Sequence, residues 1–82
     1  MVARKNYDKA VEIFRFNVTL FPGSPNVYDS LGEAYMLNGE LEPARKNFKI
    51  AIKNSKKVKD PSLKVYQAHL DKVNKELLKK GK

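Results

Sequence analysis

Apolar residues recur every three or four positions along most of this 82-residue chain, which is the spacing of one face of an α-helix. The pattern is interrupted by segments with Pro or Gly at 21–25 and 38–39, and by a basic segment at 53–59. These interruptions predict four helices and no strand, over residues 6–20, 25–37, 40–54 and 61–80. We therefore expect an all-α fold in which short turns join antiparallel helical hairpins.

Residues at the ends of these segments support the predicted boundaries. Ser24-Pro25 supplies a helix N-cap followed by Pro at the first helical position, where its missing N–H costs nothing. Asp60-Pro61 repeats this arrangement before the fourth helix. Asn38-Gly39 predicts a left-handed turn at the end of the second helix. Lys53–Lys59 is expected to be a basic linker.

Large and small residues with fixed spacing lie in the middle of the chain: Tyr28, Leu31, Gly32, Tyr35, Ala44, Phe48 and Ala51. Tyr28, Leu31 and Tyr35 are spaced i, i+3 and i+7, so they share one face of a helix. Gly32 has no side chain, which would let the following helix approach closely. Part of the set recurs 34 residues earlier, where Ala10 and Phe14 correspond to Ala44 and Phe48.

This period, with its order of aromatic, Leu-Gly, aromatic, Ala and Phe, resembles the tetratricopeptide repeat (TPR), a pair of antiparallel helices A and B. The resemblance implies a single domain over residues 1–82, a TPR-like α-solenoid fragment. It would consist of a half repeat at 5–24, a full repeat at 25–58 and a C-terminal capping helix at 60–80. The chain is also similar to the short TPR tails of bacterial esterases and serine hydrolases, which implies a C-terminal accessory domain of a larger protein.

The resemblance implies a protein–protein interaction module that binds a peptide or a partner protein in a concave groove lined by A helices. The residues expected to face that groove are Asn26, Asp29, Glu33, Met36, Lys64 and Asp71. Asp29 and Glu33 stand where a site for a peptide's terminal carboxylate would need Lys and Asn. We therefore expect the groove to prefer basic or apolar peptides.

The first helix would be a B helix without its A partner. Tyr7, Ala10 and Phe14 would pack against the missing helix, so they are expected to form an exposed apolar edge. A homodimer could cover this edge, and so could an upstream domain of a longer protein. The sequence leaves both possibilities open.

Charge is distributed unevenly along the chain. Residues 1–44 have a net charge of −2, whereas residues 45–82 have a net charge of +10. This basic half raises the alternative of a helical nucleic-acid-binding domain that uses Arg45–Lys82. The alternative is less favoured because Lys supplies twelve of its thirteen cationic residues and Arg is the better reader of phosphates and bases. No apolar run approaches the ~20 residues of a membrane span.

Few residues suit catalysis or metal binding. His69 is the only histidine and there is no cysteine, which argues against a zinc site. Asp29 and Glu33 are spaced i, i+4 and could form a carboxylate pair, but the sequence gives them no nearby histidine. Neither a nucleophile elbow nor a phosphate-binding loop is present. We therefore expect no enzyme activity, no metal and no cofactor, and the compartment stays open.

Overall fold

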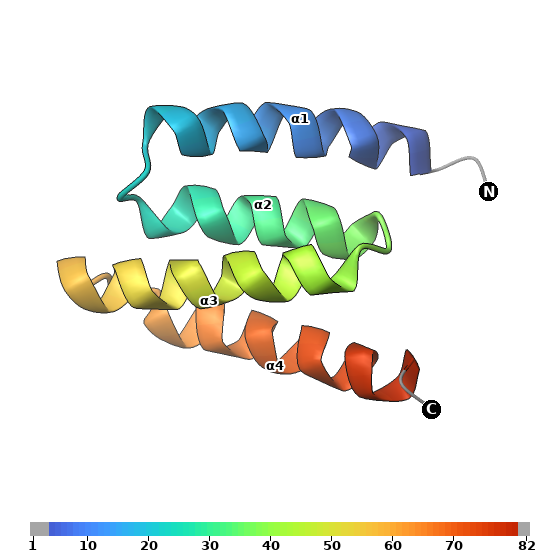
Figure 1. Cartoon of the computed structure of the whole chain (residues 1–82). Coiled ribbons are helices and arrows are strands. Elements are labelled where there is room, and N and C mark those ends of the chain that lie inside the picture. The colour runs from blue at the N-terminus through green and yellow to red at the C-terminus, as the bar shows by residue number, and fades with distance from the viewer. Residues whose placement is uncertain (1–3, 81–82) are drawn as a thin grey trace.

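The computed structural model describes residues 4–80, which form α1 (Arg4–Leu20), α2 (Pro25–Leu37), α3 (Leu41–Val58) and α4 (Leu63–Lys80). Consecutive helices run antiparallel and are joined by short turns (Figure 1). Residues 4–80 contain no strand, so the predicted all-α fold of helical hairpins is confirmed. None of these helices is both long and apolar enough to cross a membrane.

The helices stack in chain order, and each packs mainly on its neighbours in the sequence (Figure 1). Among the described residues, α1 contacts α2 and no other helix. The α2–α3 hairpin forms the centre, while α4 packs on α3 and meets α2 at a few positions only. The result is a flat body with extents of 38 × 28 × 15 Å.

The turn between α2 and α3 has the left-handed geometry predicted for Asn38-Gly39. Gly39 has a φ of 83°, a region that glycine enters without steric cost. The Glu40 N–H donates to the Tyr35 carbonyl at 2.9 Å, and the Gly39 N–H donates to the Met36 carbonyl at 3.1 Å. These two bonds form a Schellman motif, which satisfies the last carbonyls of α2 and turns the chain sharply into α3.

The predicted basic linker at Lys53–Lys59 is wrong, because α3 continues to Val58. Ser55 extends the buried face of the helix and packs where an apolar residue would be expected. Its hydroxyl donates to the Asp60 carbonyl at 3.4 Å, which satisfies its polar atom. Lys59 is the C-cap that follows the helix, and it lies in the left-handed region with φ 56° and ψ 47°.

The first residues of α2 and α4 match the predicted capping arrangements only in part. Ser24 has the extended backbone of an N-cap before Pro25, but its side chain makes no capping hydrogen bond. Asp60 does act through its side chain, since its Oδ1 accepts the Ser62 N–H at 2.8 Å. Pro61 and Ser62 form a turn, so α4 begins two residues later than predicted.

Two apolar clusters hold the stack together. The first lies between α1 and α2 and is built on the buried residues Val11, Leu31 and Ala34. The second joins α2, α3 and α4 and is built on Ala44, Phe48 and Val73. Tyr35 packs against both clusters and so links the two interfaces.

The crossing of α2 and α3 depends on the absence of a side chain at Gly32. A Cβ atom built at this position would lie 2.6 Å from Cε1 and 2.7 Å from Cδ1 of Phe48. The Phe48 ring is fully buried and therefore has no free direction in which to move. The predicted close approach of the third helix at Gly32 is confirmed.

The first helix packs by a different face from the one expected. Ala10 and Phe14 pack against the cluster of Val11, Leu31 and Ala34, and Tyr7 is half-buried. These residues therefore do not form the open edge predicted above. The reason is that packing this continuous apolar face of α1 on α2 removes apolar surface from water, which stabilises the fold even though the expected A helix is missing.

Replacing Gly32 by Leu is expected to lower the free energy of unfolding by about 1–3 kcal/mol, because the side chain collides with the Phe48 ring. Denaturant unfolding followed by circular dichroism measures the loss. Gly23→Ala is the matched control, since a Cβ there has no atom within 4 Å. This control should change stability by less than about 1 kcal/mol. Equal midpoints for Gly32→Leu and the wild type would show that the crossing does not depend on Gly32.

Replacing Lys59 by Gly is expected to stabilise the fold by about 1 kcal/mol, because Lys59 adopts a left-handed conformation that is strained for a residue with a Cβ. Thermal and denaturant unfolding provide the measurement. Lys57→Gly, two residues earlier and inside α3, should destabilise by up to about 1 kcal/mol through lost helix propensity. If both variants shift stability in the same direction, the strain at Lys59 is not significant.

Candidate functional site

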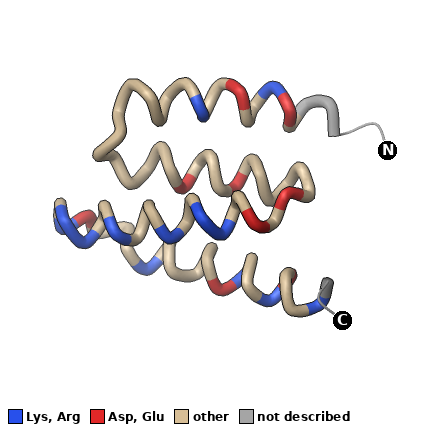
Figure 2. Tube along the Cα trace, viewed as in Figure 1, with Lys and Arg blue, Asp and Glu red and all other residues tan. Residues whose placement is uncertain are grey.

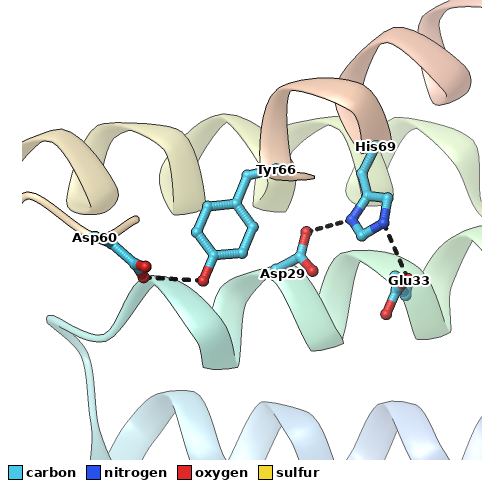
Figure 3. A network of polar contacts seen from close by, with 5 residues as sticks. All are labelled: Asp29, Glu33, Asp60, Tyr66 and His69. Carbon is cyan, nitrogen blue, oxygen red and sulfur yellow. Dashed lines mark hydrogen bonds and ion pairs between the residues drawn. The ribbon is translucent and has the colours of Figure 1, made fainter. Parts of the chain in front are cut away.

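A histidine from α4 lies between two carboxylates of α2 (Figure 3). Nδ1 of His69 is 2.8 Å from Oδ1 of Asp29, and Nε2 is 3.4 Å from Oε2 of Glu33. The i, i+4 spacing of the two acids places both on the same face of α2. While Asp29 is ionised it only accepts hydrogen bonds, so this contact then requires the tautomer of His69 with a proton on Nδ1, which donates to Asp29.

The two carboxylates lie in different environments. Asp29 is only 6% exposed, whereas the side chain of Glu33 is 52% exposed. Burial raises the pKa of Asp29 above its ordinary value, and the hydrogen bond and charge of His69 oppose that rise only in part. The His69 ring also packs on Phe48, with ring centroids 5.5 Å apart and the planes tilted by 43°. The histidine thus joins the apolar core to the polar surface of α2.

A second polar contact fixes the start of α4. The Tyr66 hydroxyl donates to Oδ2 of Asp60 at 3.0 Å (Figure 3). Tyr66 is buried, and this burial together with the nearby Asp60 carboxylate raises its pKa to about 12. The phenol therefore stays protonated and donating at all physiological pH values. Asp60 uses its two oxygens separately, one for Tyr66 and one for the Ser62 N–H.

The arrangement is best suited to holding α4 against α2. Asp29, Glu33 and His69 offer ligand atoms within 4.8 Å of one another, so their donor set could also hold a divalent metal ion. In that case Asp29 would orient the imidazole through Nδ1 and leave Nε2 as a ligand beside Glu33.

Three surface depressions of about 660, 270 and 400 Å³ are lined by other residues, so none of them brings a substrate to His69.

The expectation that Asp29 and Glu33 have no nearby histidine is wrong. His69 lies 40 residues away from Asp29 in the sequence, on a helix whose placement cannot be derived from local spacing. One signal was available, since His69 directly precedes Leu70 and so flanks the apolar stripe of α4. A polar residue on that flank is well placed to reach a neighbouring helix.

The structure separates the residues predicted to face a groove. Asn26, Glu33, Lys64 and Asp71 are exposed, Met36 is half-buried against the α2–α3–α4 cluster, and Asp29 is buried beneath α4. Asp29 therefore does not present its charge to a bound peptide. Glu33 is left as the exposed acidic side chain on α2.

The residues predicted to pack within the repeat lie inside the fold. Leu31, Gly32, Ala44, Phe48 and Ala51 are buried, and Tyr28 and Tyr35 are half-buried. Sequence reasoning missed two buried polar residues on α3, Asn47 and Ser55. The Asn47 side-chain amide donates to the Pro43 carbonyl at 2.8 Å, which explains why it is tolerated there.

Comparison with known proteins does not place the chain in a family. No protein-family model matches it, and the searches of curated proteins and of solved structures found no match either.

The raised pKa of Asp29 predicts a specific dependence of stability on pH. The folded state holds the Asp29 proton more strongly than the unfolded state, for which the ordinary value is 3.8. The stabilising contribution of this group is therefore full below that pH and is lost as pH rises through the folded pKa. Asp29→Asn lacks this titration, so its stability relative to the wild type should rise as the pH increases from 3.8 through the folded-state pKa of Asp29.

Denaturant unfolding at a series of pH values measures this difference. Asp71→Asn is the matched control, because Asp71 is exposed on the same helix as His69. The control should follow the wild type across the range. A slope of opposite sign for Asp29→Asn would mean that attraction by His69 outweighs burial.

Proposed function

We propose that this chain is a TPR-type protein–protein interaction module that binds a peptide or a partner protein on the face shared by α2 and α4. The observation that supports it most is the α2–α3 crossing, where Phe48 occupies the space left by Gly32. The sequence resemblance assigns these roles to the same two positions. The chain would act as a half repeat, a full repeat and a capping helix, within a larger protein or as a self-associating unit.

The shape of the molecule favours binding over catalysis. Its shortest extent is 15 Å, against 38 and 28 Å along the other two axes. Stacks of this kind bury each helix against its neighbours and leave long surfaces open to partners. Such a body offers much surface and little enclosed volume.

The exposed residues on α2 suggest the chemistry of a ligand. Asn26, Glu33 and Leu37 are spaced i, i+7 and i+11, so they form one exposed stripe along the helix. Asp29 is buried against His69, whereas Glu33 lies beside the same ring with half of its side chain exposed, so Glu33 supplies the accessible acidic group of this stripe. An extended peptide with a basic residue beside Glu33 and an apolar residue beside Leu37 fits it best.

The test is fluorescence polarisation with two sets of short labelled peptides that share their apolar residues and differ in having Lys/Arg or Asp/Glu. The wild type should prefer the basic set. Glu33→Lys should shift the ratio of affinities toward the acidic set by roughly fivefold. This is the factor that corresponds to about 1 kcal/mol, the contribution of one exposed charge pair. Glu42→Lys, the same change at an exposed position on α3, should leave the ratio unaltered. Equal binding of both sets by all three proteins would contradict the proposal.

A row of lysines supports a second candidate, a nucleic-acid-binding surface. Lys46, Lys49, Lys53 and Lys57 are exposed and lie on one face of α3, and cationic residues are concentrated on α3 and α4 (Figure 2). Binding through phosphates would weaken steeply as salt increases. Titration of a random oligonucleotide at several salt concentrations distinguishes this candidate from peptide binding.

A further inference from the structure

The outer face of α1 is apolar, although no described helix covers it. Ile13, Phe16 and Leu20 are 59%, 62% and 53% exposed. The opposite face of α1 packs on α2. A helix with solvent on its outer side normally carries polar residues there, so a second apolar stripe marks an interface.

The spacing of this outer stripe is the same when read from either end of the helix. Lys9, Ile13, Phe16 and Leu20 follow at intervals of four, three and four residues. An antiparallel second copy of α1 can therefore align with a two-fold axis between residues 14 and 15. In that alignment Ile13 faces Phe16 of the second copy, and Leu20 faces the aliphatic stem of Lys9 of the second copy.

Charges beside the stripe complement one another in the same alignment. Glu12 and Arg15 lie on one flank of the stripe, and a two-fold axis brings the same flank of each copy together. From a rise of 1.5 Å per residue, Glu12 of one copy lies about 3 Å along the axis from Arg15 of the other. The symmetry makes this pair twice, and the two Arg15 side chains, which adjoin at the two-fold axis, each have a Glu12 of the other copy beside them. A hollow of about 270 Å³ lined by Glu12, Arg15, Phe16 and Thr19 gives the opposing side chains room.

The overall charge also favours this face for self-association. The chain carries +8, so two copies repel each other on most approaches. Residues 7–20 contain two acidic and two basic residues and are neutral in sum. Pairing through α1 keeps the basic helices α3 and α4 of the two copies apart (Figure 2).

We propose that the outer face of α1 binds α1 of a second copy of this chain, in an antiparallel two-fold dimer. The interface consists of the stripe Lys9, Ile13, Phe16 and Leu20 flanked by Glu12 and Arg15. It is separate from the α2–α4 face proposed for ligand binding, so either proposal can fail without the other. A different helix could bind the stripe, but the repeated spacing and the paired charges are what an identical copy requires.

Sedimentation velocity over a wide concentration range tests the dimer. The wild type should show a monomer–dimer equilibrium, and Phe16→Asp should raise the dissociation constant at least roughly tenfold, as for a central aromatic residue of an interface. Leu78→Asp, at an exposed apolar position on α4, is the control and should leave the constant unchanged. Circular dichroism of both variants checks that they remain helical.

Charge exchange tests the antiparallel arrangement itself. Glu12→Arg and Arg15→Glu should each weaken the dimer alone, whereas a mixture of these two variants should form a heterodimer. A wild type that is monomeric at every concentration would overturn the proposal and leave the stripe to another protein or an upstream helix. A dimer that tolerates Phe16→Asp but not Leu78→Asp would overturn it as well.

Discussion

The packing of the Phe48 ring against Gly32 is the contact on which the rest of the structure depends. It sets the distance between α2 and α3, and α4 packs on α3 through Val73, which joins the same buried cluster. His69 lies on α4, and its ring also packs on Phe48. A larger residue at position 32 would therefore displace α3, move α4 with it and draw His69 away from Asp29. One missing side chain thus controls both the hydrophobic packing and the polar contact.

Features that depend on local spacing could be predicted from the sequence. Apolar periodicity located all four helices, and Asn38-Gly39 predicted the left-handed turn because the conformational freedom of glycine is a local property. The end of α3 could not be predicted in this way. Ser55 interrupts the apolar pattern although it is buried, and lysines at exposed positions of a helix look the same as lysines in a linker.

The contacts of the polar site could not be predicted from local spacing alone. Helical spacing correctly places Asp29 and Glu33 on one face of α2, but it cannot say which helix covers that face. The covering helix is α4, which buries Asp29 and leaves Glu33 in solvent. The same limitation affects α1, whose two apolar stripes are both periodic. Only the packing on α2 decides that Phe14 lies inside and Phe16 outside.

Packing between sequence neighbours also shapes the route by which the chain folds. Contacts between adjacent helices joined by short turns close small loops, so little chain entropy is lost before they form. Low contact order of this kind is typical of helical domains that fold within microseconds to milliseconds. The α2–α3 hairpin is central and in contact with both outer helices, so it is the natural nucleus. Within residues 4–80 α1 and α4 do not touch each other, so each can add to this hairpin without the other.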